Sequence, residues 1–205
     1  MSKLDDAIRF AIEAHSGQVR KLSKNPYILH PLEAMTICAT ITTDEDVLCA
    51  AVLHDVVEDG NRSLDEIYNK FGARVAELVS TETENKRRDL PASLTWKLRK
   101  EETLEMLKNA QDFGVKVMWM GDKLSNVRSF YDAYLKQGDA FWNMFNQKDK
   151  KEQAWYYREI YNALKPHFQG TLVFQEFEQI LYELFGKGEI VKWDLISTII
   201  NWQFI

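Results

Sequence analysis

The sequence contains little of what secreted, membrane and nucleic-acid-binding proteins require. Only two cysteines, Cys38 and Cys49, occur in 205 residues. They form neither a CxxC motif nor a disulfide framework, so we interpret both as buried reduced thiols. The opening MSKLDDAIRF has no apolar signal-peptide run, and no stretch approaches the roughly 20 apolar residues of a membrane span. The net charge of −5 argues against a general nucleic-acid binder, which usually has a basic excess. We therefore expect a cytoplasmic protein that binds neither nucleic acid nor membrane.

Strand-like alternation, internal repeats and low-complexity segments are absent as well. Apolar residues instead recur at intervals of three and four, which indicates helices. The first such face consists of Leu4, Ala7, Ile8, Ala11 and Ile12. The sequence predicts an all-α fold, a single helical bundle of about eight to ten helices.

Prolines, glycines and capping residues set the expected helix ends. One helix should start near Pro31, because proline suits the first turn of a helix. Thr43 is the expected N-cap of the next helix, which should run to Gly60. Ser63 and Glu66 match the capping box that opens a further helix.

The carboxyl-terminal part is expected to hold helices at about 151–164 and 172–185, separated at Pro166. Beyond them, residues 187–205 are unusually apolar for a free tail. This extension either packs on its own domain or forms a homo-oligomer contact, because exposed apolar patches often mark interfaces. We divide the chain into a domain at 1–186 and an extension at 187–205.

Four residues have the side chains of metal ligands: His30 in YILHP, His54 and Asp55 in LHDVVEDG, and Asp122 in MGDKLSNVR. Mixed imidazole and carboxylate donors suit Mn²⁺, Fe²⁺ or Zn²⁺, whereas all-oxygen sites suit Mg²⁺ or Ca²⁺. A His-Asp dipeptide alone is more often a surface or capping pair. Its combination with the upstream histidine and the downstream D-x-x-x-N pattern favours a metal site.

Two further carboxylates follow the dipeptide. Glu58 comes four residues after His54, and Asp59 comes four residues after Asp55, so helical spacing would put each beside a candidate ligand. Such a carboxylate suits a base that acts on a metal-activated water. A solvated helix end is the alternative, but carboxylates are unfavourable at a helix carboxyl terminus.

These motifs resemble those of the HD-domain hydrolases of the RelA/SpoT type, and more narrowly the stand-alone small alarmone hydrolases. The likeness extends over about residues 3–185. It depends on four stretches: AHSGQVRK at 14–21, PYILHP at 26–31, LHDVVED at 53–59 and GDKLSNVR at 121–128.

The resemblance implies that domain 1–186 removes pyrophosphate from the 3′ position of guanosine tetra- or pentaphosphate and returns GDP or GTP. It implies one Mn²⁺, with Fe²⁺ or Zn²⁺ as alternatives, held by His30, His54, Asp55 and Asp122. Glu58 and Asp59 would activate or position the attacking water. The implied nucleotide contacts are Arg20, Lys21, Asn126, Arg128 and Tyr156.

Several alternatives stay open. Arg20 and Lys21 could be an ordinary exposed basic pair, and Tyr156 could serve core packing. The substrate could be another phosphorylated nucleotide, or the chain could be a non-catalytic nucleotide- or partner-binding module. The last alternative would not require Glu58 and Asp59.

The sequence also departs from the family pattern. Gly121 stands where the family usually has alanine, which would loosen the helix that carries Asp122. The loop at 82–95 does not match cleanly, so no substrate contact can be assigned to it.

Overall fold

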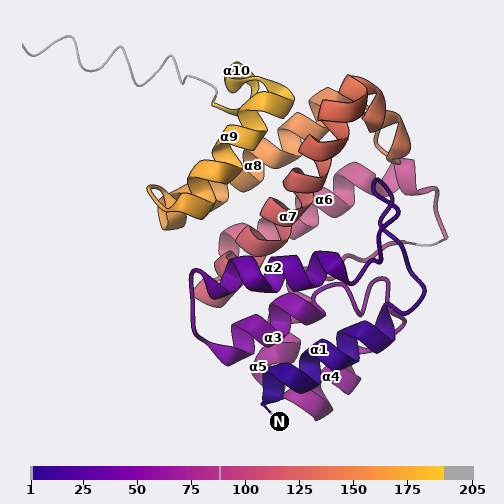
Figure 1. Cartoon of the computed structure of the whole chain (residues 1–205), viewed down its shortest axis with the longest axis vertical. Coiled ribbons are helices and arrows are strands. Elements are labelled where there is room, and N and C mark those ends of the chain that lie inside the picture. The colour runs from indigo at the N-terminus through magenta and orange to yellow at the C-terminus, as the bar shows by residue number, and fades with distance from the viewer. Residues whose placement is uncertain (1, 88, 192–205) are drawn as a thin grey trace, which may run out of the picture.

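The computed structural model describes residues 2–87 and 89–191, and within them it contains ten α-helices, one 3₁₀ helix and no β-sheet (Figure 1). The predicted all-α class is confirmed. The helices are α1 (Lys3–Ala14), α2 (Leu29–Ala39), α3 (Glu45–Leu53), α4 (Leu64–Phe71), α5 (Ala73–Ser80), α6 (Ala92–Asn109), α7 (Phe113–Gln137), η1 (Gly138–Met144), α8 (Lys150–Phe168), α9 (Leu172–Phe185) and α10 (Lys187–Ile190).

The capping-box prediction for α4 is confirmed. The Ser63 hydroxyl accepts a hydrogen bond from the Glu66 amide at 3.2 Å, and the Glu66 carboxylate accepts one from the Ser63 amide at 2.8 Å. The predicted N-cap of α3 is wrong by one residue, because Asp44 caps this helix and Thr43 does not. Aspartate and threonine are both good N-caps, so local preference alone does not choose between neighbours.

The predicted end of α3 at Gly60 is also wrong. The helix ends at Leu53, and the chain continues in turns. A physical reason lies in His54, whose Nδ1 donates to the Ala51 carbonyl at 2.8 Å. In a continuing helix this carbonyl would accept the amide of Asp55.

Helix α2 starts at Leu29, which agrees with the predicted start near Pro31 and places His30 inside its first turn. The end of α8 differs from the prediction. Helix α8 continues through Pro166 to Phe168. The buried ring of Phe168 packs near Phe113 at 5.5 Å between ring centroids, which holds this last turn in place despite the proline.

Helix α7 is the central element of the bundle. It runs between the part of the molecule built from α1 to α5 and the part built from α8 to α10 (Figure 1). From Gly114 to Ser125 only Lys123 is incompletely buried. An element surrounded by others on all sides needs apolar residues around its whole circumference. Asp122 lies in this stretch, so the fold buries a carboxylate at the centre of the molecule.

Gly121 allows α2 and α7 to approach closely. A Cβ atom at this position would lie 2.5 Å from Cys38 Sγ and 2.6 Å from the Ala34 carbonyl oxygen. The expectation that Gly121 loosens α7 is therefore replaced by a packing role, since the missing side chain makes room for α2.

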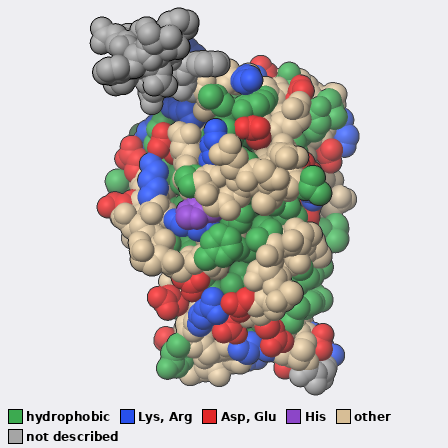
Figure 2. All heavy atoms as spheres, turned by 90° about the vertical axis from the view of Figure 1, so that its left-hand side faces the viewer, with side chains coloured by type: hydrophobic (Ala, Val, Ile, Leu, Met, Phe, Trp, Pro, Cys, Tyr) green, Lys and Arg blue, Asp and Glu red, His purple; other side chains and the backbone are tan. Residues whose placement is uncertain are grey.

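The extension begins in the described part of the chain as α10, which packs against α8 and α9 with Ile190 fully buried. Residues 192–205 lie outside the described residues, so the predictions for the tail and the domain boundary stay predictions. None of the described helices has the length and apolar composition needed to cross a membrane. Charged side chains of both signs are interspersed over the face in Figure 2.

Candidate metal centre and adjoining cavity

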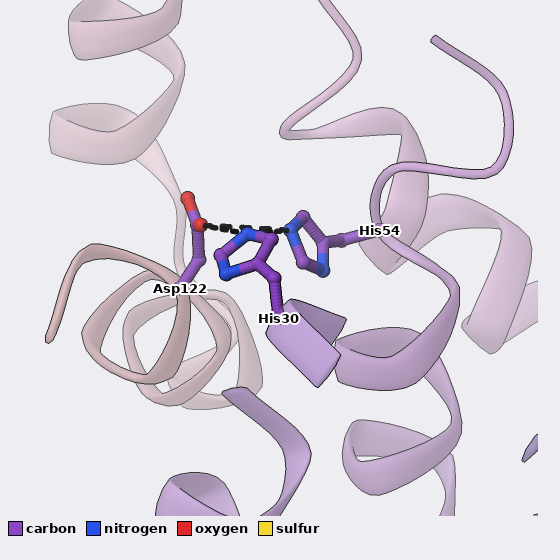
Figure 3. A group of neighbouring side chains, drawn as sticks. All are labelled: His30, His54 and Asp122. Atoms are coloured by element: carbon purple, nitrogen blue, oxygen red, sulfur yellow. Dashed lines mark hydrogen bonds and ion pairs between the residues drawn. The ribbon is translucent and has the colours of Figure 1, made fainter. Parts of the chain in front are cut away.

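Three buried side chains from separate parts of the fold point toward one another (Figure 3). His30 comes from the first turn of α2, His54 directly follows α3, and Asp122 lies in the middle of α7. His30 Nε2 lies 3.2 Å from His54 Nε2 and 3.1 Å from Asp122 Oδ1. The distance from His54 Nε2 to Asp122 Oδ1 is 3.5 Å.

Asp55 joins the same cluster. Its Oδ2 lies 3.1 Å from His54 Nε2 and 3.5 Å from His30 Nε2. The Tyr27 hydroxyl donates a hydrogen bond of 2.7 Å to this oxygen and fixes its direction. The structure thus brings together all four residues that the sequence singled out as metal ligands.

Both imidazoles are oriented by hydrogen bonds at Nδ1. His54 Nδ1 donates to the Ala51 carbonyl, which can only accept. His30 Nδ1 lies 2.8 Å from the Ser125 hydroxyl, which donates its own proton to the Glu33 carboxylate at 2.7 Å. Each histidine therefore carries a proton on Nδ1, which directs its Nε2 atom toward the cluster. Metal-binding histidines commonly have this arrangement.

The electrostatics of the cluster favour a positive charge at its centre. Burial lowers the pKa of His30. Burial also opposes protonation of His54, but the neighbouring Asp55 and Asp122 raise the pKa of His54 well above its usual value. Two neutral Nε2 atoms 3.2 Å apart would direct lone pairs at each other. A proton on one of them relieves this, and a divalent metal does so too by displacing that proton. The donor set therefore fits a divalent metal ion.

The two further carboxylates lie in the turns after α3. Burial raises the pKa of Glu58, although Lys86 opposes this shift. Lys86 Nζ lies 3.1 Å from Glu58 Oε2 and also contacts Asp59 Oδ1. The Glu84 amide donates to Glu58 Oε1. The loop at 82–95, which the motifs left unassigned, thus holds the two carboxylates in place.

A cavity of about 260 Å³ adjoins the cluster. Three of its lining residues bond directly to the candidate ligands: Tyr27 to Asp55, and Lys123 and Asn126 to Asp122. Cationic and aromatic side chains form much of the remaining wall. They are Arg20, Lys21, Lys100, Trp96, Phe130, Phe145, Tyr156 and Tyr157.

Of the five predicted nucleotide contacts, four line this cavity. Arg20 donates to Asn126 Oδ1 at 3.1 Å, and Lys21 Nζ lies 5.7 Å from the centroid of the Phe145 ring. Tyr156 is buried among other rings and also lines the cavity, so core packing and a contact with a nucleotide do not exclude each other.

Arg128 is the exception. It is not among the lining residues of this cavity. Its guanidinium binds both Glu176 oxygens at 2.7 Å and Glu33 Oε1 at 2.9 Å. The geometry separates Arg128 from the other predicted contacts.

Sequence reasoning missed four residues of the centre: Tyr27, Glu82, Lys86 and Lys123. Tyr27 and Lys123 lie inside the quoted motifs, so their nearness to His30 and Asp122 was an available signal. Glu82 is buried with neither carboxylate oxygen hydrogen bonded. Burial raises its pKa to about 7, opposed by Lys123, whose Nζ is 3.7 Å away. No local pattern distinguished Glu82 or Lys86 from ordinary loop residues.

This fold and cluster define a class. The chain belongs to the HD-domain family, whose pattern matches residues 7–145. Among curated proteins it is similar to the guanosine-3′,5′-bis(diphosphate) 3′-pyrophosphohydrolase of Aquifex aeolicus, with 31% identity over 93% of this chain and 25% of that protein. It is also similar to the GTP pyrophosphokinase of Myxococcus xanthus, with 32% identity over 58% of this chain and 16% of that protein. The chain thus spans a quarter or less of the length of these relatives.

Solved structures match over nearly their whole length. A metazoan SpoT orthologue, described as hydrolysing ppGpp, aligns with a TM-score of 0.67 and 25% identity over 89% of this chain and 96% of that chain. A protein of Listeria monocytogenes aligns with a TM-score of 0.66 and 30% identity over 77% of this chain and 99% of that one.

Proposed function

We propose that this protein is a Mn²⁺-dependent hydrolase that removes the 3′-pyrophosphate of guanosine tetra- or pentaphosphate. The observation that carries the proposal is the convergence of His30, His54, Asp55 and Asp122 beside a cationic, aromatic cavity. The pyrophosphohydrolase from Aquifex aeolicus and the ppGpp-hydrolysing metazoan protein support the substrate class.

The four converging side chains would hold the metal. A bound divalent ion lowers the pKa of a water molecule and polarises a phosphoryl oxygen. The imidazole and carboxylate donors suit Mn²⁺, and Fe²⁺ or Zn²⁺ are the alternatives for this donor set.

Glu58 is our proposed base for the attacking water. Burial raises the pKa of Glu58, which moves this carboxylate closer to the neutral range in which a general base works best. Lys86 and the Glu84 amide orient its two oxygens. Asp59 shares Lys86 with Glu58 and is half-exposed, so we assign it a positioning role for the same water.

The adjoining cavity would take the nucleotide. Arg20, Lys21, Lys100 and Lys123 supply positive charge for a substrate that carries four or five phosphates. Tyr156 and the neighbouring aromatic rings offer flat apolar faces, on which a base can stack.

The test is pyrophosphate release from guanosine tetraphosphate in the presence of Mn²⁺. We expect His54→Ala to abolish both Mn²⁺ binding and release. Glu58→Gln should keep Mn²⁺ bound and slow release by about 10²- to 10⁴-fold, the usual contribution of a general base. The exposed residues His167 and Glu105 provide matched controls, since His167→Ala and Glu105→Gln make the same changes away from the cluster.

Other outcomes identify the alternatives. Bound Mn²⁺ without pyrophosphate release would exclude this substrate, and other phosphorylated nucleotides would then be assayed. Neither binding nor release would leave the non-catalytic binding module. A cytoplasmic location and an oligomer formed through residues 187–205 stay predictions.

A further inference from the structure

A continuous line of polar contacts leads from the metal cluster to α9. His30 Nδ1 lies 2.8 Å from the Ser125 hydroxyl, and Ser125 donates to Glu33 Oε2 at 2.7 Å. The other oxygen of Glu33 accepts from Arg128 at 2.9 Å, and Arg128 binds Glu176 of α9 through two bonds of 2.7 Å. We call Ser125, Glu33, Arg128 and Glu176 the His30 relay.

The direction of each bond in the relay is determined. Arg128 only donates, so Glu33 Oε1 accepts from it, and Glu33 Oε2 accepts the proton of the Ser125 hydroxyl. The Ser125 oxygen is then left to accept the Nδ1 proton of His30. The paired carboxylates also raise the pKa of Arg128, so its charge is permanent.

Burial divides the His30 relay into an inner and an outer part. Ser125 is fully buried and His30 nearly so, while Glu33, Arg128 and Glu176 are partly exposed. The bond between His30 and Ser125 therefore lies in a water-poor environment. The ion pair of Arg128 with Glu176 lies nearer the surface and restrains the Glu33 carboxylate. A bidentate arginine pair suits this task, because it restricts rotation as well as position.

We propose that the His30 relay positions the His30 imidazole for metal binding, and that α9 thereby contributes to the metal centre. The proposal rests on the function proposed above. Its consequence is that Arg128 acts as a positioning residue through Glu33. Glu176 lies outside residues 7–145, the part that matches the HD-domain family, so α9 would be an added support for the centre.

The test measures the affinity of the protein for Mn²⁺. The protein is titrated with Mn²⁺, and electron paramagnetic resonance detects the free ion, so the readout does not depend on activity. Ser125→Ala should weaken binding by about 10- to 100-fold, as expected for the loss of a group that orients a ligand. Glu176→Gln should weaken it by about threefold, because this pair is partly exposed. Glu178→Gln is the matched control, since it makes the same change on α9 in a carboxylate that accepts from Tyr161 and Tyr182.

The double variant Ser125→Ala/Glu176→Gln separates positioning from general stability. If Glu176 acts through Ser125, the double variant should bind Mn²⁺ as Ser125→Ala does, within about twofold. Multiplicative losses, or a Glu176→Gln affinity equal to that of Glu178→Gln, would overturn the proposal. Thermal unfolding of the metal-free variants shows whether each is folded, and the surface variant Glu176→Gln keeps the test decisive if Ser125→Ala does not fold. Absence of Mn²⁺ binding by the intact protein would instead refute the proposed function.

Discussion

Substitution of Gly121 by alanine tests how closely α2 and α7 must approach. The new Cβ would lie 2.5 Å from Cys38 Sγ and 2.6 Å from the Ala34 carbonyl oxygen. The thiol can rotate, but the carbonyl belongs to the backbone of α2, so the two helices must move apart. These helices carry His30 and Asp122, whose facing atoms are 3.1 Å apart.

Two opposing energies decide the outcome. Replacing glycine by alanine inside a helix stabilises it by about 1 kcal/mol. Overpacking of a filled core costs about 1–3 kcal/mol, and a clash with backbone belongs at the upper end. We expect Gly121→Ala to lower the free energy of unfolding by about 1–2 kcal/mol, a fall in melting temperature of roughly 2–8 °C for a chain of this size. Mn²⁺ binding should weaken with it.

Urea unfolding and Mn²⁺ titration measure both effects. Gly188→Ala is the matched control, because a Cβ on this α10 glycine meets nothing within 4 Å and should not destabilise the fold. Adding Cys38→Ala to Gly121→Ala should recover part of the loss and leave the Ala34 contribution. A Gly121→Ala protein as stable as the original would refute the close-packing argument.

Three further predictions concern the centre. Burial raises the pKa of Glu82 from 4.5 to about 7. The contribution of Glu82 to the free energy of unfolding is therefore fully present below about pH 4.5. It is lost as the pH rises through 7, which lowers the free energy of unfolding by about 3 kcal/mol. Glu82→Gln should therefore raise the melting temperature of the metal-free protein more at pH 8 than at pH 5, and equal gains would contradict this. Tyr27→Phe removes the hydrogen bond to Asp55 and should weaken Mn²⁺ binding about tenfold in a calorimetric titration, whereas unchanged affinity would rule out an orienting role. Lys86→Met removes the cation that lowers the pKa of Glu58, so the acidic limb of the pH–rate profile should move to higher pH; an unmoved limb would count against Glu58 as the base.

Features that depend on near neighbours along the chain could be predicted from the amino-acid sequence. Apolar spacing identified the helices, and Ser63 and Glu66 identified a capping box, because these interactions reach only three or four residues. The candidate metal ligands could also be predicted, since histidines are few in this sequence and His30, His54, Asp55 and Asp122 lie in recognisable motifs. The wrong cap at Thr43 and the wrong helix end at Gly60 show the limit of such local preferences.

Contacts between groups that are distant in the sequence became known from the packing of the helices. Arg128 shares a motif with Asp122, yet packing of α9 directs it to Glu33 and Glu176. Lys86 lies in an unassigned loop, yet the fold brings it to Glu58. The burial of a carboxylate and the partner of a guanidinium depend on how whole helices pack. The residues next to them in the sequence do not specify that packing.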